Sequence, residues 1–270
     1  MFGDLETNRR LTARAIQFAA MAGARIVVLP ELCTTGYAFG DESEARELGE
    51  PADGPAVALW CDLAAEHRVA IVGGFCELDE DGRPRNSAAV VDPNGLRCVY
   101  RKTHLWDREQ LIFVAGTEPP PVVQTTMGRI GVAICYDAFF PEVMRALALA
   151  GADLIAVPMN SPLTEPPEGP LPIEIVLALA AAHVNRVFVA QADRSGRERG
   201  IEWAQASVIC DPDGRTLAGP VQGPAVVRAA CNLAAARDKS LGARNDVLAD
   251  RRPDLYRHRR RPSPTKETVN

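Results

Sequence analysis

A strand-turn-helix segment around Cys135 constrains the fold of this chain more than any other feature. The apolar run 130–134 is typical of a buried strand. Pro141 and Glu142 then open a helical pattern that continues to Ala150. Cys135 is therefore predicted on a turn that can hold a thiol exposed above a sheet, near backbone N–H groups that favour the thiolate. A buried structural cysteine is the alternative, because free cysteines are commonly buried.

Two other predicted strands end next to reactive side chains. The strand 26–29 stops at Pro30 and is followed by Glu31, and a later strand ends near Lys102. In α/β sheets, sites assemble at the carboxyl ends of the strands. We therefore expect a carboxylate, an ammonium group and a thiol to meet at this edge.

These three side chains have complementary chemistry. A thiol with an ordinary pKa of about 8.5 is mostly protonated at neutral pH. Glu31 could take its proton as a general base, and Lys102 could stabilise the thiolate and then the oxyanion of a tetrahedral intermediate. The set predicts acyl transfer from an amide or a nitrile through a thioester, followed by hydrolysis.

The order and spacing of these residues resemble the Glu-Lys-Cys triad of the nitrilase superfamily of carbon–nitrogen hydrolases, in its amidase-like branch. Seven segments carry the resemblance, in chain order: LPELCTTGY at 29–37, YRKTHL at 100–105, GVAICYD at 131–137, FPEV at 140–143, GADLIAVP at 151–158, NRVFVA at 185–190 and RRPDLY at 251–256. The resemblance implies one carbon–nitrogen hydrolase domain over residues 1–256. It also implies a nitrilase-like fold, which is a four-layer αββα sandwich with two mixed β-sheets.

Periodicity alone predicts an α/β fold with a mixed sheet. Apolar residues recur at helical spacing before the first of these strands, at Leu11, Ala15, Phe18 and Ala22. The sequences DPNG at 92–95 and DPDG at 211–214 each predict a hairpin turn between two short strands. No linker divides the chain into further domains.

The resemblance implies a fourth catalytic residue after the lysine. Glu109, followed by Phe113 and Gly116, matches the position of a second glutamate in the family. Its implied role is to orient Lys102 and to assist proton transfer. A solvated glutamate at the start of a helix is the alternative.

Four further residues are candidates for the walls of a substrate pocket, and each could equally serve in packing: Tyr37, Tyr136, Met159 and Asn160. In the family, residues that follow the strand 151–158 help to line the pocket. The proline-rich segment 160–170 comes directly after this strand, so it is either a loop over the site or an ordinary surface loop.

The histidines and the other cysteines give weaker indications of a catalytic or metal site. His104 is the histidine nearest a candidate residue in sequence, and we expect it to pack or hydrogen-bond beside the lysine, which leaves a Cys–His mechanism a minor option. The seven cysteines include no CxxC pair, so neither a zinc site nor a disulfide framework is favoured, and no metal or cofactor is predicted. Cys33, two residues after Glu31, is expected to be structural.

The start of the chain departs from the family pattern. Family members usually begin with a strand that runs into a segment like GDLETN, which here spans residues 3–8. The N-terminal strand is therefore missing from this sequence, and either the true start lies upstream or an interior strand is absent. Its loss would affect stability more than chemistry, because it leaves backbone groups unpaired.

Residues beside the nucleophile favour an amidase. Many nitrilases carry tryptophan where this chain has Tyr136, and no arginine follows in the segment 137–139, as it often does in N-carbamoyl amidohydrolases. We expect hydrolysis of a non-peptide C–N bond in a small aliphatic amide, giving carboxylate and ammonia. A nitrilase or an N-carbamoyl amidohydrolase with the same triad is one alternative, and a catalytically silent binding or assembly member is another.

Composition agrees with a soluble enzyme. The chain is 47% hydrophobic with a net charge of −5, which argues against disorder and against nucleic-acid partners. No apolar run approaches the roughly 20 residues of a membrane span, and no signal peptide is visible, so we expect a cytoplasmic protein. The basic tail 257–270 is expected to be disordered. The resemblance further implies a homodimer or higher homo-oligomer, with the segment 237–256 crossing to a partner subunit.

Overall fold

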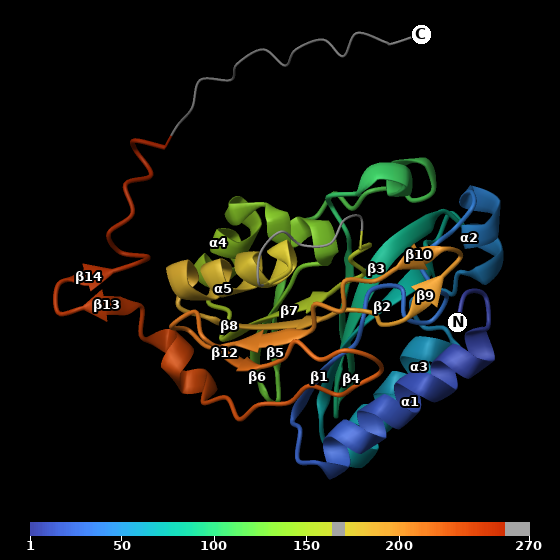
Figure 1. The fold of residues 1–270 in the computed structure, drawn as a ribbon, viewed down its shortest axis with the longest axis horizontal. Helices are drawn as coiled ribbons and strands as arrows, with labels where there is room; N and C mark the ends of the chain where they lie inside the picture. The colour runs from blue at the N-terminus through green and yellow to red at the C-terminus, as the bar shows by residue number, and fades with distance from the viewer. Residues whose placement is uncertain (164–170, 257–270) are drawn as a thin grey trace, which may run out of the picture.

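The computed structural model describes residues 1–163 and 171–256 (Figure 1). Its helices are α1 (Leu5–Met21), α2 (Glu42–Leu48), α3 (Pro55–His67), α4 (Pro141–Leu149) and α5 (Ile173–Asn185), with 3-10 turns η1 (Asp107–Leu111), η2 (Cys135–Phe139) and η3 (Leu233–Arg237). Its strands are β1 (Ile26–Val28), β2 (Ala70–Leu78), β3 (Pro84–Asp92), β4 (Gly95–Arg101), β5 (Val122–Thr125), β6 (Gly128–Val132), β7 (Leu154–Pro158), β8 (Phe188–Ala192), β9 (Arg197–Glu198), β10 (Ile201–Glu202), β11 (Val208–Cys210), β12 (Thr216–Ala218), β13 (Ser240–Gly242) and β14 (Asn245–Asp246).

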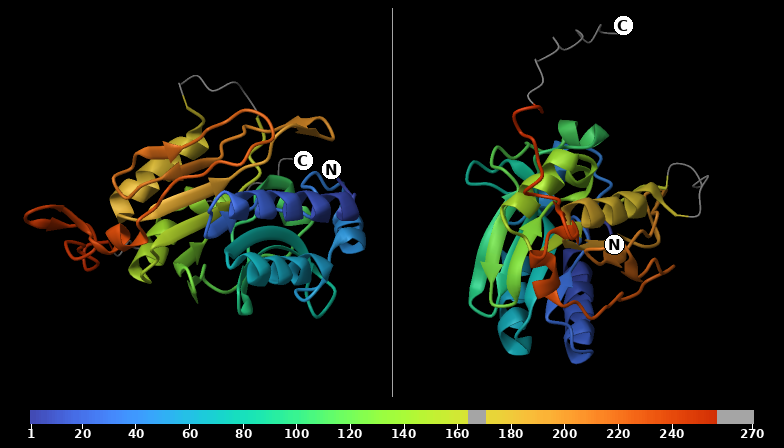
Figure 2. Two further views of the ribbon diagram at one scale, coloured as in Figure 1. Left: turned by 90° about the horizontal axis from the view of Figure 1, so that it is seen from below. Right: turned by 90° about the vertical axis from the view of Figure 1, so that its left-hand side faces the viewer.

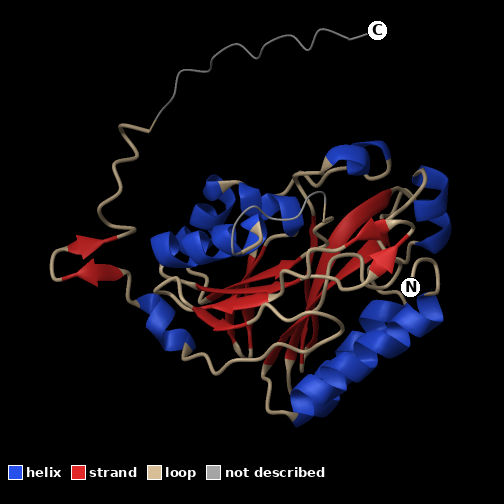
Figure 3. Ribbon diagram, viewed as in Figure 1, coloured by secondary structure: helices blue, strands red, loops and turns tan. Residues whose placement is uncertain are grey.

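Two β-sheets pack face to face, and helices cover both outer faces (Figure 3). One sheet has the strand order β1-β2-β3-β4, and the other has the order β12-β11-β8-β7-β6-β5. Helices α1 and α3 cover the first sheet, and α4 and α5 cover the second. Both sheets mix parallel and antiparallel pairs, so the molecule is the four-layer αββα sandwich that the family resemblance implied.

Apolar clusters fill the interfaces between the layers. Val72 and Val90 of the first sheet belong to one buried cluster with Val132 of the second. Trp60 and Phe75 belong to another cluster, between the first sheet and its helices. Burial of this apolar surface holds the layers in register, and it is the main favourable term in folding.

Helix α1 buries a different face from the one that its apolar residues predicted. Leu11 and Phe18 are 49% and 58% exposed, whereas Asn8 and Thr12 are buried. The polar residues can be buried because their side chains have partners: the Asn8 amide donates to two backbone carbonyls, and the Thr12 hydroxyl accepts from the Trp60 indole at 3.3 Å. The predicted helix is present, but its apolar spacing does not indicate which face is buried.

The parallel strands β6, β7 and β8 bring their carboxyl ends to one edge of the second sheet. Cys135 and Asn160 follow the first two of these strands, and Asp193 directly follows the third. Glu31 and Lys102 follow β1 and β4 of the first sheet, so the site draws on both sheets. The predicted hairpins are present as the β3–β4 and β11–β12 pairs.

The C-terminal part that the structure describes leaves the body of the molecule. Figure 2 shows residues 240–256, which include the β13–β14 pair, projecting from the two-sheet core. The basic tail 257–270 and most of the predicted loop, 164–170, lie outside the described residues. Within the described ranges, every helix is too short or too polar to cross a membrane.

Gly74 on β2 allows the turn with Glu31 to approach the sheet. A Cβ atom at this position would lie 2.5 Å from Glu31 Cα and 2.7 Å from Leu32 N, both of which are backbone atoms. We expect Gly74→Ala to displace the turn, to destabilise the protein by about 1–3 kcal/mol in urea unfolding, and to impair the chemistry that depends on Glu31. Gly40→Ala, where a Cβ meets only the end of the Glu44 side chain at 3.4 Å, is the control and should change neither property.

Candidate active site

Lys102 lies between two carboxylates in the interior. Its Nζ donates to Glu31 Oε1 at 2.7 Å and to Glu109 Oε1 at 2.9 Å. The side chains of Lys102 and Glu31 are 0% exposed, and that of Glu109 is 3% exposed. Glu109 is therefore no solvated helix-start residue, and the structure brings it to the lysine as the family resemblance implied.

Glu31 is fixed by amides from both sheets. Asn86 on β3 donates its Nδ2 to Glu31 Oε1 at 2.7 Å. Asn160, after β7, donates its backbone N–H to Glu31 Oε2 at 3.0 Å and its Nδ2 to the Glu31 carbonyl at 2.8 Å. The carboxylate thus receives donors on both oxygens, which restricts its rotation.

Cys135 occupies the turn between β6 and α4, and its φ of +45° is in the left-handed region. Such a conformation costs of order 1–3 kcal/mol for a residue other than glycine, and it persists only where the surroundings fix it. The thiol lies against Asn160, with Sγ 3.7 Å from the carbonyl oxygen. Asn160 therefore contacts both Cys135 and Glu31.

Asp137 fixes the turn that carries Cys135 through several hydrogen bonds. Its buried carboxylate accepts the Ile134 N–H at 3.0 Å, the Tyr100 hydroxyl at 2.8 Å and the His104 N–H at 3.1 Å. These bonds join the turn at the nucleophile to the segment around Lys102, since Tyr100 and His104 lie on either side of the lysine. Asp137 thereby holds two parts of the site at a fixed separation.

The electrostatics of Glu31 suit proton transfer at neutral pH. Burial raises the pKa of Glu31 to about 7, although the Lys102 ammonium acts in the opposite direction. Burial alone would lower the pKa of Lys102, but the carboxylates of Glu109 and Glu31 raise it well above its ordinary value. The lysine therefore stays charged, while Glu31 can accept and return a proton near pH 7.

The structure corrects the expectation of an exposed thiol that favours its ionised form. Cys135 is only 9% exposed. Burial and the nearby Glu31 carboxylate raise the pKa of the Cys135 thiol well above its ordinary value, and Lys102 offsets only part of this effect. The thiol is therefore protonated at rest, so a reaction at sulfur requires its proton to move to a base.

The four predicted pocket residues take different positions. Tyr37 donates its hydroxyl to Glu109 Oε1 at 2.7 Å, so it contacts the charged cluster. Asn160 is completely buried against Glu31, as described above, and Met159 is 1% exposed with its backbone carbonyl near the Glu31 N–H. Tyr136 is partly exposed and packs edge-on against Trp106, with ring centroids 4.7 Å apart.

Two secondary expectations can be compared with the structure. His104 directs Nδ1 at Asp137 Oδ1, 2.7 Å away, and stacks on Phe140 with ring centroids 4.0 Å apart. This confirms that it packs beside the lysine segment. Cys33 donates its thiol to the Gly74 carbonyl at 3.2 Å, as a structural residue would.

Several residues that hold the site escaped the sequence analysis. Asn86 looks like any polar residue of a strand, and Asp137 looks like an ordinary turn residue. Asp137 could have been found, because a short acidic side chain two residues after a nucleophile on a turn often accepts the free N–H groups there. Nothing in the local sequence of Asn86 distinguishes it.

Comparison with known proteins identifies the family. A model of the carbon–nitrogen hydrolase family matches residues 2–239. A protein named nitrilase from Pyrococcus abyssi is 36% identical over 253 residues, which is 93% of this chain and 93% of that protein. An (R)-stereoselective amidase from a Pseudomonas species is 34% identical over 217 residues, covering 80% of this chain and 75% of the relative. The chain therefore belongs to the carbon–nitrogen hydrolase family.

Solved structures agree with this assignment. The amidase from Nesterenkonia sp. AN1 superimposes with a TM-score of 0.75 at 25% identity, over 94% of each chain, in a form that shows Michael addition of acrylamide at its active site cysteine. A carbon–nitrogen hydrolase from Helicobacter pylori G27 gives a TM-score of 0.81 at 24% identity, over 95% of this chain and 94% of its own, which supports the fold.

The pKa of Glu31 predicts how the reactivity of Cys135 depends on pH. Below this pKa the carboxyl group is protonated and cannot accept the thiol proton, and above it the carboxylate can. We expect alkylation of Cys135 by iodoacetamide to accelerate about tenfold between about pH 6 and pH 8 and then to level off, since Glu31 has a pKa of about 7. The modified fraction at Cys135 would be followed by mass spectrometry.

The Glu31→Gln variant is the control for this measurement. It should lose the step near pH 7 and react slowly throughout, because the amide cannot take the proton. A rate that keeps rising through pH 9 in both proteins, as for an ordinary thiol, would contradict the role of Glu31 as the base.

Proposed function

We propose that this carbon–nitrogen hydrolase cleaves a small, aliphatic amide to carboxylate and ammonia through a thioester on Cys135. The observation that carries the proposal is the buried ammonium of Lys102 between the carboxylates of Glu31 and Glu109, close enough to act on the pKa of Cys135. The cluster combines a nucleophile, a base and a fixed positive charge in one water-poor site.

In the first half-reaction, Glu31 takes the proton of the Cys135 thiol as sulfur attacks the carbonyl carbon of the amide. The C–O π electrons move to oxygen, and Lys102 stabilises this oxyanion. When the intermediate collapses, the C–N bond breaks and the nitrogen takes the proton from Glu31. Ammonia leaves, and the acyl group remains on sulfur as a thioester.

The second half-reaction returns the enzyme to its resting state. Water attacks the thioester carbon and gives a proton to Glu31, and the second oxyanion is again stabilised by Lys102. The C–S bond then breaks, the sulfur recovers its proton from Glu31, and the carboxylic acid leaves. In both halves, Glu109 keeps Lys102 charged and in position.

The surroundings of the thiol favour a small acyl group. Cys135 is buried, its thiol lies against the Asn160 carbonyl, and the next residue in the chain, Tyr136, packs edge-on against Trp106. Trp106 is 44% exposed and Tyr136 is partly exposed, and we propose that this aromatic pair forms one apolar wall for the substrate. An aliphatic chain fits such a wall without requiring a charged partner.

Ammonia release by the purified protein tests the proposed function. The panel contains aliphatic amides, aromatic amides, N-carbamoyl compounds and nitriles, and Cys135→Ala serves as the control. We expect release from aliphatic amides with the wild-type protein and a loss of at least about a thousandfold in the variant, because the nucleophile is gone. Release from nitriles or N-carbamoyl compounds instead would correct the substrate class.

Absence of ammonia release from every compound in the panel would test whether the protein is an enzyme at all. If the folded wild-type protein released no ammonia while Cys135 was alkylated no faster than the other six cysteines, the protein would be the catalytically silent alternative.

All seven cysteines are free thiols, which suits a reducing compartment, and we propose the cytoplasm as the location.

We also propose that the protein is a homodimer. The projecting segment 240–256 carries apolar side chains without cover in one chain: Leu241, Leu255 and Tyr256 are 51%, 65% and 53% exposed. A second copy would bury these side chains. We expect sedimentation to give about twice the chain mass of 29.1 kDa, and Leu255→Asp to shift the protein toward the monomer. A monomeric wild-type protein at all concentrations would refute the dimer.

A further inference from the structure

The hydroxyl of Tyr37 takes part in the charged cluster without being part of the triad. It donates to Glu109 Oε1 at 2.7 Å, the oxygen that also accepts from Lys102 at 2.9 Å. Burial and the charges of Glu109 and Glu31 raise the pKa of Tyr37 well above its ordinary value, so the hydroxyl remains a neutral donor. The orientation of Glu109 therefore depends on where Tyr37 lies.

Glu198 holds the backbone at Tyr37. Its Oε1 accepts the N–H groups of Tyr37 at 2.7 Å and of Ala38 at 2.8 Å. Glu198 lies on β9, about 160 residues later in the chain, and is 8% exposed. Hydrogen bonds to a buried carboxylate are among the stronger ones in proteins, and two of them converge here on one oxygen.

A glycine before Tyr37 leaves space for the Glu198 carboxylate to approach the backbone. The residue before Tyr37 is Gly36, with a φ of +96°, and a Cβ atom there would lie 2.8 Å from Glu198 Oε2. Only glycine combines this backbone conformation with the space that the carboxylate occupies. The close approach of the Glu198 carboxylate to the backbone before Tyr37 therefore requires glycine at position 36.

Arg194 neutralises and anchors the same carboxylate. Its guanidinium pairs with Glu198 Oε2, donates to the Leu32 carbonyl at 3.2 Å and lies over the Trp203 ring at 5.6 Å. Trp203 in turn packs edge-on against Tyr37, with ring centroids 5.7 Å apart. The ring and the backbone of Tyr37 are therefore both held by this group of residues.

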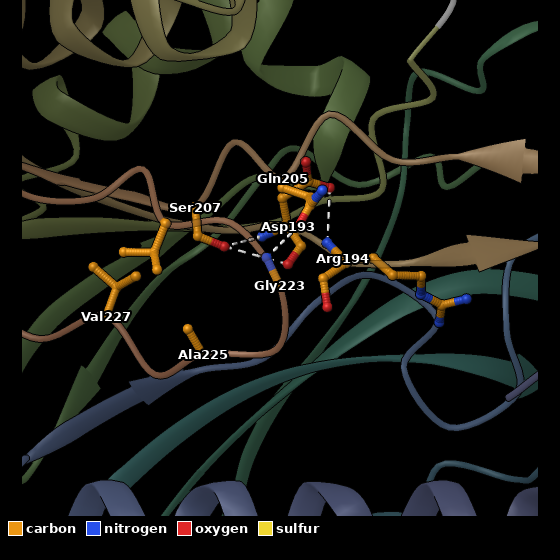
Figure 4. A pocket seen from close by; sticks show the side chains of 9 residues that line it. Asp193, Arg194, Gln205, Ser207, Gly223, Ala225 and Val227 are labelled. Atoms are coloured by element: carbon orange, nitrogen blue, oxygen red, sulfur yellow. Dashed lines mark hydrogen bonds between the residues drawn. The ribbon is translucent and has the colours of Figure 1, made fainter.

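Asp193, which precedes Arg194, holds this segment at the end of β8 in the second sheet. Asp193 accepts the N–H groups of Ser161 at 3.0 Å and Ala206 at 2.8 Å. Figure 4 shows the Arg194 side chain pointing away from the small cavity beside Asp193. That cavity, of about 40 Å³, has room for a few water molecules and not for an amide substrate, so these residues do not form a second substrate site.

We propose that Glu198 is a positioning residue for the hydrolysis reaction, acting through Tyr37 on Glu109 and thereby on Lys102. This inference rests on the proposed function of the site. Glu198 touches neither the thiol nor the triad lysine, so its removal should leave the binding of the amide largely intact. It should reduce the rate of the steps in which Lys102 stabilises an oxyanion, because that stabilisation depends on exact placement of the ammonium.

Two substitutions at Glu198 and one at Tyr37 test the proposal. In Glu198→Ala both backbone N–H groups lose their acceptor, and we expect kcat to fall at least about tenfold with KM changed less than about twofold. Glu198→Gln keeps an oxygen for these N–H groups but loses the pairing with Arg194, so it should recover part of the loss. Glu202→Gln, at an exposed carboxylate on the adjacent β10, is the matched control and should behave as wild type.

The double variants separate positioning from general damage to the fold. Tyr37→Phe removes the hydroxyl while the backbone N–H groups stay bound to Glu198. In the Tyr37→Phe background, Glu198→Ala and Glu198→Gln should lower kcat little further, because the hydrogen bond through which they act is already absent. Losses that multiply would show that Glu198 acts by another route and would overturn the proposal.

Thermal unfolding and thiol alkylation complete the test. If Glu198→Ala does not fold, Glu198→Gln and Tyr37→Phe decide the question: wild-type kcat in both variants would also overturn the proposal. If the wild-type protein releases no ammonia from any amide, the proposed function fails separately. The same variants can then be compared by the rate at which Cys135 is alkylated. Glu198→Ala or Glu198→Gln should slow alkylation when Tyr37 is present, and should not slow it further in the Tyr37→Phe background.

Discussion

The site depends on one buried ion cluster, the Lys102 ammonium between Glu31 and Glu109. Removing charges from water costs several kcal/mol for each ion, and their attraction compensates only where the geometry is good and the remaining lone pairs have donors. The protein supplies those donors from distant elements, including Asn86 on β3 and the Tyr37 hydroxyl. A strand of the first sheet and the loop after β1 therefore each supply a donor to one of the two carboxylates.

The chemical types at the strand ends could be predicted, because their positions follow from short-range patterns. An apolar run that stops at Pro30 places Glu31 just past a strand, and the apolar run 130–134 before a helix start at Pro141 places Cys135 on the turn between them. Glu109 was implied only by the family resemblance. The fold followed from the resemblance of the segments around these residues, since periodicity alone gave only a mixed α/β sheet. The structure then places the four side chains on elements that converge.

What the sequence could not predict depends on contacts between distant segments. Glu198 and Tyr37 are separated by about 160 residues, and nothing near Glu198 indicates that it faces a backbone loop. Helix α1 buries Asn8 and Thr12, which have partners in the interior, although a hydrophobic pattern counts them as surface residues. The exposure of Cys135 was also overestimated: the turn could hold a thiol exposed above the sheet, whereas the packed interior leaves Cys135 only 9% exposed.

The division of the site between two sheets has a consequence for the newly made chain. Glu31, Lys102 and Glu109 are synthesised before Cys135, and their layer has a core of its own around Trp60 and Phe75. The sulfur acquires its proton acceptor only when the second sheet has docked onto the first. A Cys135 without this interface would have no carboxylate in place to take its proton, so its reactivity as a nucleophile depends on the completed packing of the two sheets.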